Sequence, residues 1–291
     1  MNEKAFFTGV CTALVTPFIR GEVNYPMLER LLQHQMDAGI RNIVICGTTG
    51  ESPTLADGEK LEMFKRAKEY VGDRCKIIAG TGSNCTEHAI RLSRAAEAVG
   101  ADGLLLVSPY YNKATPEGLF AHYSAIAAAV GIPCILYNVP SRTGVDIPVE
   151  VYRKLSRIPN IAGVKEATSD IVKIARILSE CPGFPVWSGN DDQIVPVMAL
   201  GGSGVISVLS NVAPEKTKAM ADAALDGDFD TASSLQLRLL PLIRALFSEV
   251  NPIPVKAAMK ELGFDCGNCR LPLTPMGEEN FKKLKAVLPL R

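Results

Sequence analysis

The sequence alternates between short apolar runs and longer segments in which apolar residues recur at helical spacing. Each run ends in Gly, Ser, Thr or Pro, as a strand that leads into a turn does. The runs are mostly continuous, which is typical of strands buried on both faces of a parallel sheet. The runs are CTALVTP near Cys11, NIVICG near Ile43, KIIAG near Ile77, GLLLVSP near Leu105, CILYN near Leu136, IAGVKE near Val164, VWSGND near Trp187 and GVISV near Ile206. Eight strands, each followed by a helix, predict an α/β fold of the (β/α)8 TIM barrel type.

Signals at the helix boundaries agree with this fold. Thr86 with Glu87, and Pro116 with Glu117, are typical helix starts. Glycines that would lie just past helix ends are Gly39, Gly72, Gly100 and Gly131. A doubly wound sheet is the main alternative, but it normally needs a GxGxxG fingerprint, which GTGSN near Gly80 does not match.

The pattern becomes purely helical after Ile206. It begins at Ala213 and continues to the end of the chain, with breaks near Gly227, Pro252 and Gly263. A chain of 291 residues is compatible with one large barrel domain, and two smaller domains are the alternative. We expect a catalytic barrel over residues 1–225 and a C-terminal helical region over residues 226–291.

Charge and hydropathy limit the expected partners. Lys plus Arg and Asp plus Glu each total 31, and no basic run marks a surface for nucleic acid. Apolar runs such as 104–107 are far shorter than the ~20 residues that cross a bilayer. The N-terminus also lacks the cleavage site of a signal peptide. We expect a cytoplasmic protein that binds neither nucleic acid nor membrane.

The cysteines favour free thiols over a disulfide framework. Eight are spread along the chain, and Cys46 and Cys134 lie within expected strands. Cys266 and Cys269 have CxxC spacing, but no second pair or nearby His completes a set of metal ligands. We expect no metal site, and a surface loop is favoured for this pair over a redox or zinc function.

Reactive groups in a (β/α)8 barrel lie at the carboxyl ends of the strands. Polar residues in such positions are therefore stronger candidates for a catalytic or binding role than polar residues on helices. They are Thr48 and Thr49, Ser108 to Asn112, Tyr137 to Thr143, Lys165 with Glu166, and Gly189 to Asp191.

Lys165 is unusual because it ends the apolar run IAGV, whereas most other lysines lie in helix-like segments. A lysine amine withdrawn from water can act as a nucleophile and condense with a ketone or aldehyde to an imine. Tyr137 ends the neighbouring strand and could exchange protons at the same centre. The alternative is that Lys165 forms an internal ion pair with Glu166 or Asp191 and that Tyr137 only packs there.

Two further features could hold a carboxylate. The GTTGE segment, Gly47 to Glu51, offers backbone N–H groups and Thr hydroxyls in a βα turn. Arg142 offers a planar guanidinium suited to bidentate binding of a carboxylate, and a loop-stabilising arginine is the alternative.

Six motifs together resemble the dihydrodipicolinate synthase and N-acetylneuraminate lyase superfamily. They are GTTGE at Gly47, SPYYNK at Ser108, YNVPSRTG at Tyr137, GVKEAT at Gly163, SGND at Ser188 and GVISV at Gly204. The resemblance spans the barrel and implies Lys165 as the imine-forming residue and Tyr137 as the acid and base.

The same resemblance assigns roles to other residues. Thr48 and Tyr111 would join Tyr137 in a proton relay, with Tyr111 reaching across a tight dimer into the site of a second copy. Thr49 and the main chain at Ile206 would hold the carboxylate of pyruvate, and Gly189 is a further substrate-binding candidate.

The segment VPSRTG resembles the synthase branch of the superfamily, in which the arginine binds the carboxylate of L-aspartate 4-semialdehyde. The implied reaction joins pyruvate to this aldehyde and yields 4-hydroxy-tetrahydrodipicolinate, on the route to lysine and diaminopimelate. No cofactor is implied, because the lysine imine is itself the electron sink, and a homotetramer of tight dimers is expected. The alternatives are another pyruvate-dependent 2-oxo acid aldolase and a non-catalytic paralogue that binds a 2-oxo acid.

Lysine inhibition is expected to be weak or absent. The chain keeps Ser52, Asn84 and Tyr110 at positions that match lysine-inhibited relatives. However, Lys60 replaces a common histidine, and His88 replaces an acidic residue expected to hold the amino group of the effector. Both changes disfavour a cationic ligand.

Overall fold

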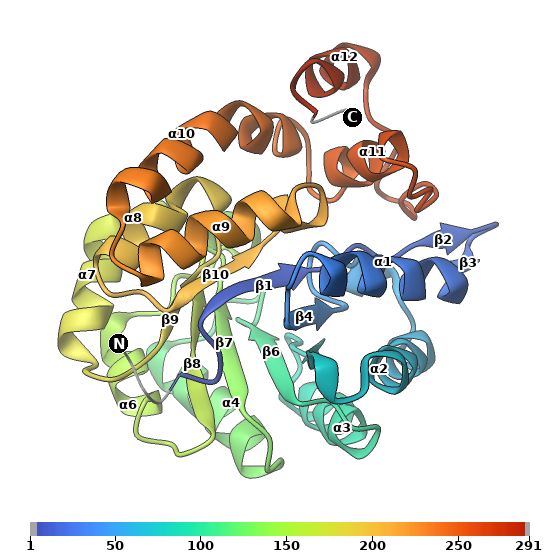
Figure 1. Ribbon diagram of the computed structural model, residues 1–291. Helices are drawn as coiled ribbons and strands as arrows, with labels where there is room; N and C mark the ends of the chain where they lie inside the picture. The colour runs from blue at the N-terminus through green and yellow to red at the C-terminus, as the bar shows by residue number, and fades with distance from the viewer. Residues whose placement is uncertain (1–4, 289–291) are drawn as a thin grey trace.

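A computed structural model describes residues 5–288 and contains a closed barrel of eight parallel strands (Figure 1). The strands are β1 (Gly9–Ala13), β4 (Asn42–Ile45), β5 (Lys76–Gly80), β6 (Gly103–Val107), β7 (Cys134–Asn138), β8 (Ile161–Glu166), β9 (Val186–Ser188) and β10 (Gly204–Ser207). The chain visits them in spatial order, and β1 pairs with both β4 and β10 to close the barrel. The predicted (β/α)8 fold and all eight predicted strands are confirmed.

Two apolar layers hold the barrel, because successive side chains of a strand point to opposite faces. On β7, Ile135 and Tyr137 belong to the cluster that fills the barrel interior. Cys134 and Leu136 belong to the larger cluster between the strands and the helices. This alternation decides which residues at the strand ends reach the barrel mouth.

The helices of the outer layer follow the strands in turn. They are α1 (Tyr25–Asp37), α2 (Asp57–Val71), α3 (Thr86–Ala98), α4 (Pro116–Ala128), α6 (Val149–Leu155), α7 (Ile171–Glu180), α8 (Ile194–Ala199) and α9 (Pro214–Leu225). The predicted starts at Thr86 and Pro116 are confirmed. Gly39, Gly72 and Gly100 lie just past helix ends with φ values of +81°, +57° and +93°, in the left-handed region that glycine tolerates best.

Short elements at the strand ends were not predicted. A hairpin of β2 (Phe18–Ile19) and β3 (Glu22–Val23) follows β1, and the four-residue helix α5 (Pro140–Thr143) follows β7. Single 3-10 turns are η1 (Ser52–Thr54), η2 (Gly72–Arg74), η3 (Asp191–Gln193) and η4 (Leu209–Asn211). Elements of this length are set by their tertiary surroundings more than by periodicity.

The C-terminal region contains α10 (Phe229–Leu246), α11 (Ile253–Glu261) and α12 (Glu278–Val287). Helix α10 packs along α8 and α9, while α11 and α12 lie together beyond it (Figure 1). The predicted helical extension is therefore present. A division of the chain at residue 225 stays a prediction.

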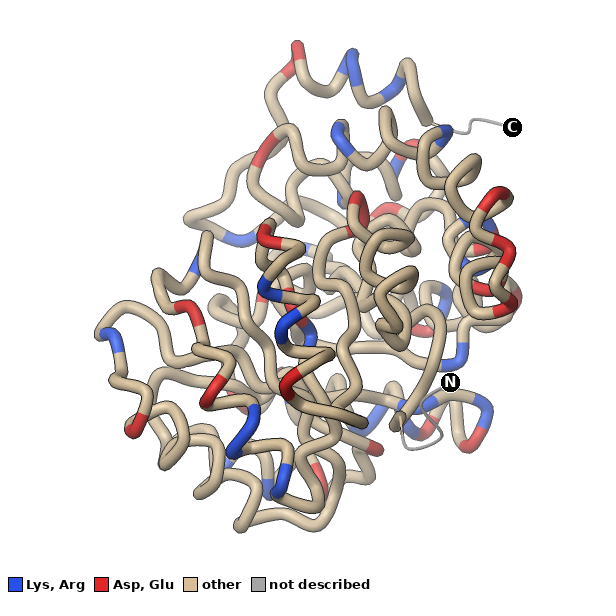
Figure 2. The backbone as a smooth tube through the Cα atoms, turned by 90° about the vertical axis from the view of Figure 1, so that its left-hand side faces the viewer, with Lys and Arg blue, Asp and Glu red and all other residues tan. Residues whose placement is uncertain are grey.

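Over residues 5–288, no helix is both long and apolar enough to span a membrane. Acidic and basic residues are interspersed over the face shown in Figure 2. The eight cysteines are free thiols, as expected. In the described part of the chain, no group of three His, Cys, Asp or Glu side chains could hold a metal ion.

Candidate active site

Lys165 and Tyr137 lie side by side on neighbouring strands. They are paired in the parallel register of β7 and β8. Both are buried, and the Lys165 Nζ lies 4.5 Å from the centre of the Tyr137 ring. The structure therefore brings together the two residues that the sequence analysis placed at one reaction centre.

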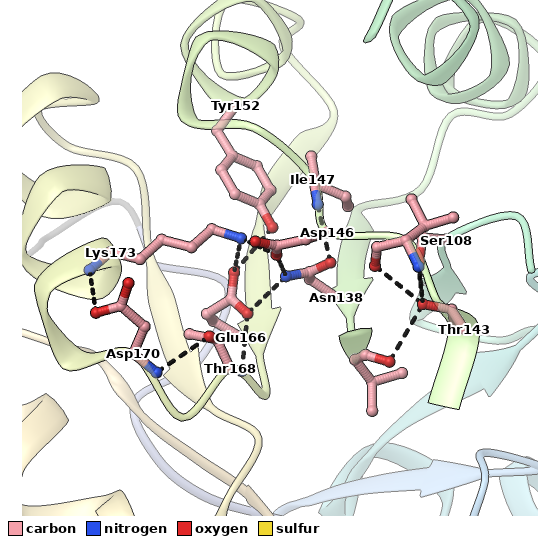
Figure 3. A network of polar contacts seen from close by, with 12 residues as sticks. Ser108, Asn138, Thr143, Asp146, Ile147, Tyr152, Glu166, Thr168, Asp170 and Lys173 are labelled. Carbon is pink, nitrogen blue, oxygen red and sulfur yellow. Dashed lines mark hydrogen bonds and ion pairs between the residues drawn. The ribbon is translucent and has the colours of Figure 1, made fainter. Parts of the chain in front are cut away.

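The residues that follow them point outward and form a separate polar network (Figure 3). The fully buried Glu166 accepts hydrogen bonds from Asn138 at 2.8 Å and from the Tyr152 hydroxyl at 2.9 Å. Lys173 on α7 forms ion pairs with Glu166, at 3.6 Å, and with Asp146. Burial raises the pKa of Glu166, and the Lys173 charge and the hydrogen bonds oppose that rise. The carboxylate of Glu166 is thus engaged with the helix layer and turned away from Lys165.

Asp191 was the other candidate for an ion pair with Lys165. Its Oδ2 accepts hydrogen bonds from the backbone N–H groups of Val208 and Leu209 at 3.0 and 2.8 Å. Burial raises the pKa of Asp191, and the hydrogen bonds to its carboxylate and the positive charge of Lys165 oppose that rise. Across residues 5–288, none of the ion pairs includes Lys165. The ion-pair alternative for Lys165 is therefore not supported by either carboxylate.

A cavity of about 950 Å³ opens at the carboxyl ends of the strands. Thr48, Tyr111, Tyr137 and Arg142 all line it. A large concave site at this end of the barrel is the expected place for a substrate. Four of the eight candidate residues thus line the cavity; Lys165 and Thr49 do not, and Lys165 lies behind the Tyr137 ring that it contacts.

Tyr111 and Arg142 lie on the outer rim of this cavity. Tyr111 is 91% exposed and has a φ of +74°, an uncommon conformation for a bulky residue. Arg142 is exposed on α5, which is anchored by the buried Thr143 hydroxyl through hydrogen bonds with the carbonyls of Val139 and Val145. Both side chains are thus free to meet a ligand or a second protein chain.

The loop from Gly47 to Glu51 carries Thr48 and Thr49. Thr48 is partly exposed at the cavity, whereas Thr49 is only 2% exposed. The Thr49 Oγ1 accepts a hydrogen bond from Asn251 Nδ2 at 3.0 Å. A Cβ added at Gly50 would lie 3.0 Å from the Cys46 Cα, so a side chain here would crowd the backbone of the turn. The contact with Asn251 fixes the orientation of the Thr49 hydroxyl.

Ile206 and Gly189 do not line this cavity. Ile206 is fully buried on β10 within the barrel interior. The Gly189 N–H donates to the carbonyl of Glu166 at 2.7 Å, and a Cβ there would approach the Ala167 Cβ to 2.6 Å. Gly189 is thus required for close packing of the segments after β8 and β9, and its role toward a substrate stays a prediction.

Sequence reasoning missed Glu51, Lys256 and Asn251. Glu51 and Lys256 form a buried ion pair of 2.9 Å, with 1% and 3% of their side chains exposed. Their separation of 205 positions left no local signal in the sequence. The only hint was the placement of Glu51 at the end of the GTTGE segment.

In the lining of the same cavity, Lys60 and His88 share the carboxylate of Asp57. His88 Nε2 lies 2.8 Å from Asp57 Oδ2, and Lys60 Nζ lies 4.0 Å from Oδ1. The other ring nitrogen of His88 contacts the Ser83 hydroxyl at 3.1 Å. No pattern in the sequence singled out Asp57. Its carboxylate is already engaged by Lys60 and His88.

The fold and the site define a class of protein. It is a (β/α)8 barrel with a buried lysine at the end of a strand, beside a tyrosine and outside any ion pair among the described residues. Lysine-dependent aldolases belong to this class, because such an amine can form an imine with a carbonyl substrate.

The chain belongs to the Dihydrodipicolinate synthetase family, whose sequence model matches residues 6–290. It is 50% identical to a 4-hydroxy-tetrahydrodipicolinate synthase of Acetivibrio thermocellus over 287 residues, which cover 98% of each chain. A relative of the same name from Caldicellulosiruptor saccharolyticus is also 50% identical, with 97% of this chain and 96% of the relative covered. The crystal structure of a dihydrodipicolinate synthase from Aquifex aeolicus matches with a TM-score of 0.95 and 45% identity, covering 98% of this chain and all of the other.

Proposed function

We propose that this protein condenses pyruvate with L-aspartate 4-semialdehyde to form 4-hydroxy-tetrahydrodipicolinate. The observation that carries the proposal is the buried Lys165 amine beside Tyr137, outside any ion pair of the described residues. Relatives that are 50% identical in sequence over nearly the whole chain are named 4-hydroxy-tetrahydrodipicolinate synthase.

The first step is imine formation. The Lys165 Nζ attacks the ketone carbon of pyruvate, a C–N bond forms, and water leaves after proton transfers. Tyr137, whose ring lies against the amine, would pass the protons. Thr48 of the same cavity and Tyr111 of a second copy of the chain would continue the relay. Thr49 and the backbone at Ile206 would hold the pyruvate carboxylate.

The second step joins the two substrates. Loss of a methyl proton converts the imine to an enamine, whose carbon attacks the aldehyde, and the new alkoxide takes up a proton. The amino group of the former semialdehyde then attacks the imine carbon, closes the ring and releases the Lys165 amine. Arg142, exposed on the rim, offers its guanidinium to the carboxylate of the second substrate.

The imine can be tested by reduction. Borohydride with pyruvate is expected to trap an adduct on Lys165, which mass spectrometry of the digested protein would locate. Lys165→Ala should remove the label. An unmodified wild-type protein would contradict the proposed chemistry, and would favour a paralogue that only binds a 2-oxo acid.

The identity of the second substrate is tested at Arg142. Arg142→Ala is expected to raise the KM for aspartate semialdehyde by roughly tenfold to a hundredfold, because it removes a charge-assisted contact. The pyruvate concentration for half-maximal trapping should stay unchanged. Faster retro-aldol cleavage of other 2-oxo acids than condensation would instead favour another aldolase of the superfamily.

We also propose a cytoplasmic homotetramer built from tight dimers. The support is the exposure of Tyr111 on the cavity rim, which fits a residue that contacts a second copy of the chain. We further propose that residues 1–225 form the catalytic barrel and residues 226–291 an appended helical region.

A further inference from the structure

The C-terminal region contacts the loop that carries Thr48 and Thr49. Asn251, which precedes α11, donates through Nδ2 to the Thr49 hydroxyl at 3.0 Å. Lys256 on α11 pairs with Glu51 at 2.9 Å, and the backbone N–H of Arg270 donates to the other Glu51 oxygen at 2.8 Å. The middle and the far end of this loop are therefore held by residues about two hundred positions later in the chain.

Glu51 needs these contacts to keep its conformation. Its φ of +56° and ψ of +36° lie in the left-handed region, which disfavours a residue with a side chain. Its carboxylate is buried, and its negative charge helps to raise the pKa of the Cys269 thiol, after burial of that thiol as the main cause. Lys256 has a second acceptor, the carbonyl of Asn268 at 3.1 Å. The ion pair and its neighbours thus fix the end of the loop in one geometry.

Asn251 controls the hydroxyl of Thr49 in a different way. Because the Thr49 Oγ1 accepts the hydrogen bond from the amide, its own proton stays available for donation. A threonine side chain that binds a carboxylate must donate its hydroxyl proton to a carboxylate oxygen. The Asn251 contact therefore prepares Thr49 for an anionic ligand.

We propose that Asn251 and Lys256 are positioning residues for pyruvate binding, which hold Thr49 and Glu51 so that the loop presents its hydroxyls to the substrate carboxylate. This rests on the proposed function, in which Thr49 holds that carboxylate. The C-terminal helical region is accordingly part of the substrate site, although none of its residues lines the cavity beside Tyr137.

The first test replaces Asn251. Asn251→Ala is expected to raise the pyruvate concentration for half-maximal borohydride trapping by about tenfold, the scale of one hydrogen bond to an anion. The kcat at saturating pyruvate should change by less than about threefold, a split between KM and kcat that general loosening of the fold would not give. Asn280→Ala is the matched control, because Asn280 lies in the same region and its side-chain amide donates to Glu249, at 2.9 Å, and not to the loop of Thr49.

A double-variant cycle tests whether Asn251 acts through Thr49. Thr49→Val should raise the half-saturating pyruvate concentration, and adding Asn251→Ala should then have little further effect. Fully additive losses, or an unchanged pyruvate dependence in Asn251→Ala, would overturn the role of Asn251.

The role of Lys256 is tested without leaving a charge unpaired. Glu51→Gln combined with Lys256→Met removes both charges, whereas either change alone would strand a buried charge. We expect a raised half-saturating concentration in the double variant and a near-normal one in Lys256→Arg. A folded double variant with the wild-type trapping curve would overturn this role. If the wild-type protein itself traps no pyruvate, the proposed function fails and not this inference alone.

Discussion

Lys165 and Tyr137 owe their contact to the pairing of two parallel strands. Each is the next-to-last residue of its strand and points inward, while the last residue, Asn138 or Glu166, faces the helix layer. A shift of one residue in either strand would exchange these faces. The outward hydrogen bond between Asn138 and Glu166 therefore supports the inward placement of the reacting pair.

Removal of the Tyr137 hydroxyl should slow proton transfer while sparing the fold. We expect Tyr137→Phe to lower kcat by about a hundredfold to ten-thousandfold, the usual contribution of a general acid or base. Its melting temperature should stay within a few degrees of the wild type. Activity within threefold of wild type would show that another group moves the proton.

We expect the response to lysine to depend on Lys60, His88 and Asp57. The Lys60 ammonium repels a cationic ligand, and Asp57 is already shared between Lys60 and His88. We expect weak or absent inhibition of the purified enzyme by lysine. Half-inhibition at sub-millimolar lysine would contradict this expectation.

At the scale of elements, the helix layer buries titratable groups that the proposed chemistry does not use. His122 on α4 is 5% exposed, and its Nδ1 contacts the Thr86 hydroxyl at 2.9 Å, which links α4 to the start of α3. Burial lowers the pKa of His122 from 6.5 to about 4. The folded protein therefore keeps this imidazole neutral.

This burial predicts a loss of stability in acid. Because the folded pKa lies below the unfolded one, the unfolded chain binds the proton first, and stability falls as the pH drops from 6.5 to about 4. The contribution is about 3 kcal/mol at most. His122→Gln should show a smaller drop in melting temperature between pH 7.5 and pH 4.5 than the wild type. Parallel curves for the two proteins would refute this cause.

At the scale of the whole molecule, residues far apart in the sequence meet at the barrel mouth. The loop after β4 and the start of α11 are joined by Thr49 with Asn251 and by Glu51 with Lys256. Tyr111 extends from the same rim into open space. The barrel and the C-terminal region thus meet next to the candidate site, and Tyr111 is exposed on its rim.

If Tyr111 serves the site of a second copy, two inactive proteins should complement each other. Tyr111→Phe and Lys165→Ala each lose activity, but a mixed dimer contains one site with an intact Lys165 and an intact Tyr111. Dissociating and reassembling the mixture should restore part of the wild-type activity. No recovery, with mixed oligomers verified by mass spectrometry, would show that Tyr111 acts within its own chain.

The barrel and the positions of its strands could be predicted because continuous apolar runs and helix boundaries are local signals. Lys165 also stood out locally, as a charged residue at the end of an apolar run. The hairpin after β1 and α5 could not be predicted, because such short elements carry too few periodic positions. Asn251 precedes α11 and Lys256 lies on it, and the pattern of this segment gives no sign of the loop that they contact.

The sequence by itself determined the (β/α)8 fold, the lysine at the sixth strand and the family resemblance, because periodicity and motifs are written along the chain. Only the tertiary structure decided that neither Glu166 nor Asp191 forms an ion pair with Lys165. Glu166 turns to Lys173, and Asp191 binds the backbone after β10. It also decided that Glu51 pairs with Lys256, since a contact across 205 positions depends on how the chain closes in space.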